Sequence, residues 1–207
     1  MSKIQFYTHP MSRGQIARWA LHEAGADYET HVVEYGDRMK GDAYLAINPM
    51  GKVPAIVHES RVVTEVAAIC AYLAETFPAA GLAPEASERA DYFRWLFFVA
   101  GPLEQALSLT HLGIAPTPEQ QRTLGCGDPA RVVDVLCAKL ARDAFVCGER
   151  FTMADVYVGS HVDWGLAFGT LPELAPLQAY AERIRRRSAY QAAKAIDAAL
   201  IAERNPG

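Results

Sequence analysis

The sequence predicts a two-domain chain, with an α/β domain at residues 1–80 and an all-α, helical-bundle domain at residues 87–207. Three observations lead to this division. Strand-like and helix-like patterns alternate as far as residue 77, and residues 78–86 then carry prolines and a glycine among mainly small residues. Beyond this short linker the periodic patterns have helical spacing, and none has the alternation of a strand.

Each element at the start of the first domain has its own signal. Residues 4–8 have a strand pattern, and apolar positions then recur at helical spacing over residues 16–24 until Gly25 ends the helix. Residues 28–33 alternate and are rich in β-branched side chains, which favours a second strand. Residues 34–51 show no regular pattern, so we expect an irregular segment there.

A hairpin and a helix complete the first domain. Residues 53–58 and 61–64 predict two strands joined by a turn at Glu59-Ser60. A stripe of apolar positions then predicts a helix over residues 66–77, with Cys70 on its core-facing side.

Polar residues mark the helix starts of the second domain. The four expected capping residues are Ser87, Thr117, Asp128 and Thr152. Proline follows Thr117 and Asp128 at the first helical position. Asp155 completes a capping box with Thr152. We expect the first helix to kink at Gly101-Pro102 and the boxed helix to run to about residue 168. Two further helices are predicted at residues 177–187 and 189–203.

Composition and charge restrict the class of protein. The chain is 51% hydrophobic and 21% charged, with a formal net charge of −4, so it gives no electrostatic reason to expect nucleic acid as a partner. The arginines of residues 183–187 are interpreted as a solvated helix end. There is no signal-peptide pattern, and no apolar run reaches the roughly 20 residues that span a bilayer. We therefore expect a soluble, cytoplasmic protein with no membrane partner.

Neither cysteine nor histidine spacing indicates a metal or redox site. The four cysteines match neither a zinc-binding pattern nor a Cys-x-x-Cys pair, and the six histidines form no His-Glu-x-x-His motif. We predict no bound metal.

The run Asn48-Pro49-Met50-Gly51-Lys52-Val53-Pro54 carries the first functional signal. Pro54 lies where a strand should begin, a position that suits a residue unable to donate a ladder hydrogen bond. If the Val53-Pro54 bond is cis, the backbone of Val53 turns outward and can pair with a peptide-like ligand. The alternative is an ordinary turn before an edge strand.

Thr64-Glu65-Val66 carries the second signal, because a strand here passes directly into a helix. The free N–H groups at a helix start attract anions, so a carboxylate-bearing ligand is one interpretation. The other is that Glu65 is a surface acid that complements the helix dipole.

Tyr7 to Gln15 carries the third signal. Ser12 and Gln15 have capping-box spacing at the start of the first helix. A thiolate placed there would gain a hydrogen bond from the serine and the positive helix end. Lowering a thiol pKa by about two units requires about 2.7 kcal/mol, which these two effects can supply together. The alternative is that Ser12 is only a cap.

In this order and spacing, these segments and the Phe151-Thr152-Met153-Ala154-Asp155 box resemble the glutathione transferase family over essentially the whole chain. The resemblance implies a thioredoxin-like N-terminal domain that binds glutathione as co-substrate. It also implies a helical domain that helps to form an apolar pocket, and a homodimer.

The resemblance also implies residue roles. Lys40 and Lys52 would face the glycine end of glutathione, Val53 would pair with its cysteinyl backbone next to a cis Pro54, and Glu65 with its neighbour would hold the γ-glutamyl end. The side chains suggested for the apolar pocket are Met11, Tyr35, His111 and Phe168.

Two positions depart from the family pattern. Val66 stands where most members carry a serine that binds the γ-glutamyl carboxylate, and the lost hydrogen bond should weaken binding by about ten- to hundredfold. The thiol-activating residue is Ser12 if the chain follows the serine-type classes, Tyr7 if it follows the tyrosine-type classes, or neither.

The function expected from this resemblance is transfer of the glutathione thiolate to a small, largely apolar electrophile. Glutathione-dependent isomerisation or dehalogenation would use the same site. A non-enzymatic binding or regulatory protein is the alternative that Val66 favours.

Overall fold

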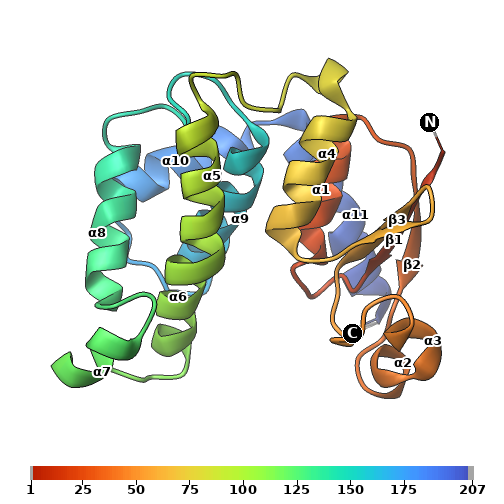
Figure 1. Cartoon of the computed structure of the whole chain (residues 1–207), viewed down its shortest axis with the longest axis horizontal. Coiled ribbons are helices and arrows are strands. Elements are labelled where there is room, and N and C mark those ends of the chain that lie inside the picture. Colours follow the sequence, from red (N-terminus) through yellow and green to blue (C-terminus); the bar gives the residue numbers. More distant parts are fainter. Residues whose placement is uncertain (1, 205–207) are drawn as a thin grey trace. The chain divides into compact units, whose positions relative to one another are not determined.

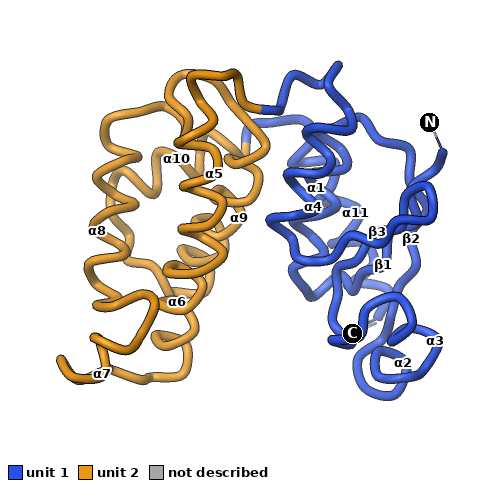
Figure 2. Tube along the Cα trace, in the orientation of Figure 1, with its two compact units in different colours: residues 1–83, 186–207 blue, residues 84–185 orange. Residues whose placement is uncertain are grey.

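The computed structural model of the chain describes residues 2–204, which form two compact units (Figure 2). Unit 1 is drawn from residues 1–83 and 186–207, and unit 2 is residues 84–185. The sequence-based division at 1–80 and 87–207 groups the last helix with the other helices, whereas in the structure this helix packs within unit 1.

Unit 1 contains a four-stranded mixed sheet. Its strands are β1 (Ile4–Thr8), β2 (Tyr28–Val32), β3 (Ala55–His58) and β4 (Arg61–Val63). The order across the sheet is β2-β1-β3-β4, with β1 and β2 parallel and the other neighbours antiparallel. This confirms the thioredoxin-like arrangement expected for the N-terminal domain.

Helices cover one face of this sheet. Ile4, Phe6 and Thr8 alternate as the fully buried residues of β1, on the side where α1 (Gly14–Ala24) and α4 (Val66–Thr76) pack side by side (Figure 1). The opposite face carries a smaller apolar cluster, which consists of Val33, Met39 and Tyr44 with Tyr7, Ile47 and Val53 packed against it.

The segment over residues 34–51 is more regular than its sequence indicates. It contains two four-residue helices, α2 (Asp37–Lys40) and α3 (Asp42–Leu45), each preceded by a glycine. These turns are too short to show a periodic pattern, and they exist because Met39 and Tyr44 fill the smaller cluster.

Two predicted turns of unit 1 are confirmed. Gly25 ends α1 in the left-handed conformation, with φ of 63°. Glu59 and Ser60 have φ values of 49° and 67°, the conformation that a two-residue hairpin turn requires.

The final helix, α11 (Ser188–Arg204), packs along α1. Between them the guanidinium of Arg18 donates to the Asp197 carboxylate over 3.0 Å, and the two side chains are 1% and 2% exposed. Arg187 also donates to both carboxylate oxygens of Glu23, at 2.6 and 2.7 Å.

Unit 2 is helical throughout its regular elements. They are α5 (Arg89–Phe98), a π-helical turn (Val99–Leu103), α6 (Glu104–His111), α7 (Pro118–Thr123), α8 (Pro129–Leu140), α9 (Met153–Ala167) and α10 (Ala175–Arg185). The predicted kink coincides with the π-helical turn that contains Gly101 and Pro102. The helix starts predicted at Thr117, Asp128 and Thr152 are also confirmed.

One prediction for the helical region is wrong, and a second is incomplete. Ser87 does not cap α5, which begins at Arg89 after Glu88; the Glu88 carboxylate accepts the Glu85 N–H and pairs with Arg150. The arginine cluster does lie at the C-terminal end of α10, where Arg185 and Arg186 are exposed. It also makes contacts that the sequence does not indicate, because Arg185 donates to Asp163 over 2.6 Å. Within residues 2–204, no helix is long and apolar enough to cross a membrane.

Candidate functional site

One end of the sheet gathers the segments singled out by the sequence. Tyr7 pairs with Ala55 across β1 and β3, so the loop that leaves β1 runs beside the Val53-Pro54 segment that enters β3. Ile56 pairs with Val63 across β3 and β4, so the chain leaving β4 toward α4 passes on the other side of the same segment. We call this the site end of the sheet.

Ser12 lies in the loop between β1 and α1. Its Oγ donates to the His9 carbonyl at 2.6 Å and accepts the Gly14 N–H at 3.0 Å. The predicted capping box with Gln15 is wrong, since α1 begins at Gly14 and the Gln15 amide donates instead to the Pro10 carbonyl. The hydroxyl therefore braces its own loop, with its proton directed at His9.

Gly14 permits this compact loop. A Cβ at this position would lie 1.9 Å from Oγ1 of Thr8 and 3.0 Å from Oγ of Ser12. The approach of the helix start to the end of β1 therefore requires a residue with no side chain.

His9 organises the outer part of the loop. Its Nδ1 accepts the Met11 N–H at 3.2 Å, and its Nε2 lies 3.4 Å from the Glu34 carboxylate. The Tyr35 ring packs on the imidazole with centroids 4.2 Å apart, and the Tyr35 hydroxyl donates to the Met11 carbonyl at 3.0 Å. Met11 and Tyr35 are 56% and 53% exposed, so an apolar surface borders Ser12.

Tyr7 points to the other face of the sheet. Its ring stacks on His31 with centroids 4.8 Å apart and packs against Tyr44 in the smaller cluster. Because strand side chains alternate, Thr8 and not Tyr7 faces the helix side on which Gly14 lies. The structure does not bring Tyr7 and Ser12 together.

Hydrogen bonds to backbone carbonyls order the segment that contains Lys40 and Lys52. The Lys40 ammonium donates to the carbonyls of Met50 and Gly51 at 3.2 and 2.7 Å. The Lys52 side chain is exposed. The backbone carbonyl of Lys52 accepts two hydrogen bonds of 2.7 Å each, from the Tyr44 hydroxyl and the Asn48 amide.

Tyr44 and Asn48 were missed as site residues from the sequence. Together they hold the Lys52 carbonyl in place immediately before Val53. The Val53-Pro54 peptide bond is cis, as predicted. Burial raises the pKa of Tyr44 to about 12, so its phenol remains a donor at neutral pH. The Asn48-Pro49 dipeptide was the available signal, because Asn48 Oδ1 accepts the Met50 N–H as in an Asx turn.

At the start of α4, Glu65 adopts φ of 62° and ψ of 116°, an unusual backbone conformation for a residue other than glycine. Its side chain is exposed, while Val66 is buried to 8% exposure. The first backbone hydrogen bond of the helix joins the Ile69 N–H to the Glu65 carbonyl. In the described part of the chain, the N–H groups of residues 66–68 therefore remain available to an anion.

His111 and Phe168 belong to unit 2. His111 is exposed at the end of α6, and Phe168, 75% exposed, follows α9. Within residues 2–204, no group of three or more histidine, cysteine, aspartate or glutamate side chains gathers as a metal site would require.

Two family descriptions match the chain. "Glutathione S-transferase, N-terminal domain" matches residues 11–76, and "Glutathione S-transferase, C-terminal domain" matches residues 105–187. The helical C-terminal domain expected from the sequence agrees with the second match and with unit 2.

Individual proteins match over most of their length. Glutathione S-transferase GstA of Escherichia coli O157:H7 is 29% identical, covering 91% of this chain and 96% of that protein. Glutathione S-transferase 3 of Zea mays is 32% identical, covering 75% of each. A theta class glutathione S-transferase of Xanthomonas axonopodis pv. citri, solved with glutathione bound, is 29% identical with a TM-score of 0.74, covering 93% of this chain and 97% of that one. The chain therefore belongs to the glutathione S-transferase family.

Proposed function

We propose that this enzyme binds glutathione at the site end of the sheet and transfers its thiolate to a small, largely apolar electrophile. The observation that carries the proposal is the convergence of three features there: the Ser12 loop, the cis Val53-Pro54 bond and the open start of α4. The Xanthomonas relative with bound glutathione supports the choice of co-substrate.

The start of α4 suits the γ-glutamyl end of glutathione. The N–H groups of residues 66–68 offer donors to its carboxylate, and the exposed Glu65 carboxylate offers an ion-pair partner to its amino group. Val66 contributes only its backbone N–H, because its side chain is apolar and buried.

The Val53-Pro54 segment suits the middle and glycine end of the tripeptide. Val53 would pair with the cysteinyl backbone. It lies between the Lys52 carbonyl, which accepts two side-chain hydrogen bonds, and the cis bond to Pro54. Lys40 and Lys52 are exposed cations suited to the terminal carboxylate.

Ser12 is our choice for the thiol-activating residue. A hydroxyl proton rotates about its C–O bond, so Ser12 can turn its proton from the His9 carbonyl to a thiolate. This carbonyl keeps the Ser12 N–H as a donor, at 3.1 Å, so the rotation leaves no buried acceptor without a partner. Tyr7 is the second choice, because its ring packs in the smaller cluster.

The electrophile would lie against the exposed apolar surface of Met11 and Tyr35. The role proposed for His111 and Phe168 of unit 2 in binding the electrophile rests on the family resemblance. The substitution Val66→Ser tests the proposed glutathione orientation: calorimetry should show about tenfold tighter binding, the low end of the range for one charge-assisted hydrogen bond. Unchanged or weaker binding would contradict the assigned orientation.

A symmetric homodimer is part of the proposal. Phe93 and Phe97 lie one helical turn apart on α5 and are 47% and 72% exposed, which is unusual for aromatic side chains on one helix face. A second copy that covers this face would bury both rings.

A non-enzymatic binding protein is the second candidate, and the buried Val66 is the observation that favours it. Retention on immobilised glutathione, followed by an assay with a generic aryl halide, separates the two. Retention with conjugation supports the transferase, and retention without conjugation supports the binding protein.

A further inference from the structure

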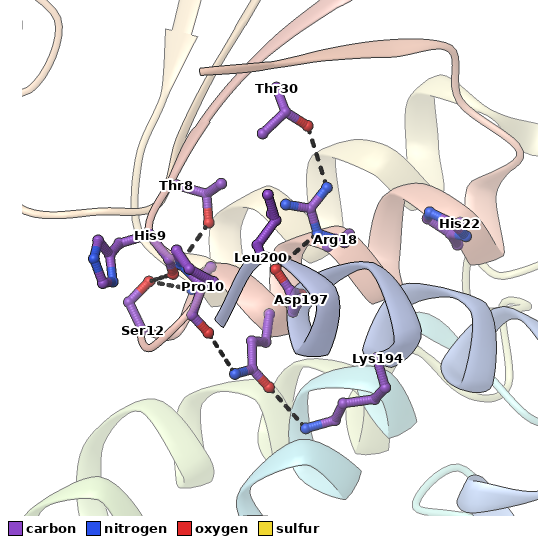
Figure 3. A network of polar contacts seen from close by, with 12 residues as sticks. Thr8, His9, Pro10, Ser12, Arg18, His22, Thr30, Lys194, Asp197 and Leu200 are labelled. Carbon is purple, nitrogen blue, oxygen red and sulfur yellow. Dashed lines mark hydrogen bonds and ion pairs between the residues drawn. The ribbon is translucent and has the colours of Figure 1, made fainter. Parts of the chain in front are cut away.

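The last helix of the chain is connected to the Ser12 loop by a relay of polar side chains (Figure 3). The Lys194 ammonium on α11 donates to Oε1 of Gln15 at 2.9 Å. The amide nitrogen of Gln15 donates in turn to the Pro10 carbonyl at 2.6 Å. Both side chains are partly buried, so these bonds are less screened by solvent than surface contacts are.

Gln15 fits this relay in only one orientation. The Pro10 carbonyl can only accept and the Lys194 ammonium can only donate, so the amide nitrogen must face Pro10 and the amide oxygen must face Lys194. The side chain is therefore locked at both ends, and it fixes the position of Pro10 relative to α11.

Pro10 is adjacent to the residue that orients the serine. The His9 carbonyl accepts both the Ser12 hydroxyl, at 2.6 Å, and the Ser12 N–H, at 3.1 Å. A displacement of Pro10 would therefore carry the His9 peptide with it and change where Ser12 points its proton.

A second, more exposed link reaches the same loop. Arg204 on α11 donates to the Glu34 carboxylate at 2.9 Å, and Glu34 lies 3.4 Å from Nε2 of His9. Because Glu34 is 48% exposed, salt should weaken this link more than the Gln15 link.

Both links start from α11, which a buried ion pair holds against α1. The Arg18–Asp197 pair holds α11 to α1 from a position that is almost fully buried, and Arg18 also donates to the hydroxyls of Tyr28 and Thr30 on β2, at 3.2 Å each. Arg18 of α1 therefore connects α11 to the sheet, and Lys194 lies on the helix that is held in this way.

We propose that Gln15 and Lys194 are positioning residues through which α11 sets the orientation of Ser12, and thereby the acidity of the bound thiol. This inference rests on the proposed function. It adds that α11, which is far from Ser12 in the sequence, influences the pKa of the bound glutathione thiol. Neither residue needs to touch glutathione.

The substitution Gln15→Met tests the proposal without changing charge. It should raise the pKa of the enzyme-bound glutathione thiol, and it should lower kcat/KM at neutral pH by about three- to tenfold, the range expected for one neutral hydrogen bond. Alkaline pH should restore the rate. Lys194→Met should act in the same direction, and Lys194→Arg, which keeps a donor, should recover most of the effect.

Lys3→Met is the matched control, because it removes an exposed lysine from the same unit. It should leave the pH profile unchanged. A wild-type pH profile in both Gln15→Met and Lys194→Met would overturn the proposal, and so would a loss of stability with no change in the thiol pKa.

Amide hydrogen exchange provides a readout that needs no ligand. The amides of residues 11–14 should exchange faster in Gln15→Met and Lys194→Met than in the wild-type protein or in Lys3→Met. If the wild-type protein does not ionise glutathione, the proposed function fails. Exchange then tests only the positioning of the Ser12 loop by Gln15 and Lys194, and an unchanged rate in residues 11–14 refutes it.

Discussion

Removing one member of the Arg18–Asp197 ion pair should destabilise unit 1 strongly. The two side chains are 1% and 2% exposed and their charged atoms lie 3.0 Å apart. Asp197→Ala leaves the guanidinium buried without its counter-ion, which costs about 3–5 kcal/mol in comparable sites. Since Arg18 keeps its bonds to Tyr28 and Thr30, we expect the lower part of this range, about 3 kcal/mol.

The chain provides an optical reporter for this experiment. Trp19 on α1 packs edge-to-face on Tyr190 of α11, with ring centroids 5.0 Å apart, so its fluorescence should follow the release of α11. Urea titrations of Asp197→Ala should show this loss, with the change in Trp19 emission at lower urea than in the wild-type protein. Tryptophans of unit 2 should be replaced by phenylalanine to isolate the signal.

A double variant distinguishes lost attraction from an uncompensated charge. In Arg18→Met/Asp197→Leu no charge is left buried, so most of the lost stability should return. A cost below about 1 kcal/mol for Asp197→Ala, the value typical of an exposed pair, would refute the view that this pair is buried and holds α11 to α1.

Three further predictions concern other parts of the molecule. Gly14→Ala places a Cβ 1.9 Å from Oγ1 of Thr8, so it should cost about 1–3 kcal/mol in chemical denaturation and slow glutathione conjugation. Gly101→Ala, where a Cβ meets nothing within 4 Å, is its control; equal costs would contradict the steric account. Burial raises the pKa of Asp155 from 3.8 to about 6. The folded state therefore holds a proton more tightly than the unfolded state, and the contribution of Asp155 to stability should fall as pH rises from about 4 to about 6 and then level off. Asp155→Asn should lose this slope in stability measured against pH, and an identical slope would show that another group is responsible. Phe97→Ser should shift the proposed dimer toward a monomer in analytical ultracentrifugation, and a wild-type sedimentation profile would place the interface elsewhere.

Local signals were sufficient to predict most of the fold. The cis bond before Pro54, the hairpin turn at Glu59-Ser60 and the cap at Thr152 each depend on residues close together in sequence, and the structure has all three. Ser87 was a misleading local signal, because the competing pair between Glu88 and Arg150 joins residues 62 positions apart.

The orientation of the site residues could not be predicted in this way. The bond from Lys194 to Gln15 and the pair between Arg18 and Asp197 each join residues 179 positions apart, and no periodic pattern indicates such contacts. Spacing alone suggested a capping box for Ser12 and Gln15, whereas in the structure Gln15 is drawn to Pro10 and Lys194 and leaves Ser12 bonded to His9. Long-range packing therefore sets the conformation of the loop that we propose as thiol-activating.

The most direct test of the account is the ionisation of glutathione bound to the enzyme, followed by thiolate absorbance in the ultraviolet as pH is varied. A free thiol has a pKa of about 8.5, and we predict a value about two units lower in the complex with the wild-type protein. In Ser12→Gly, which removes the hydroxyl donor, the pKa should return toward that of the free thiol. An unshifted pKa in the wild-type complex, or a shift that Ser12→Gly preserves, would contradict the claim that the Ser12 loop activates the thiol.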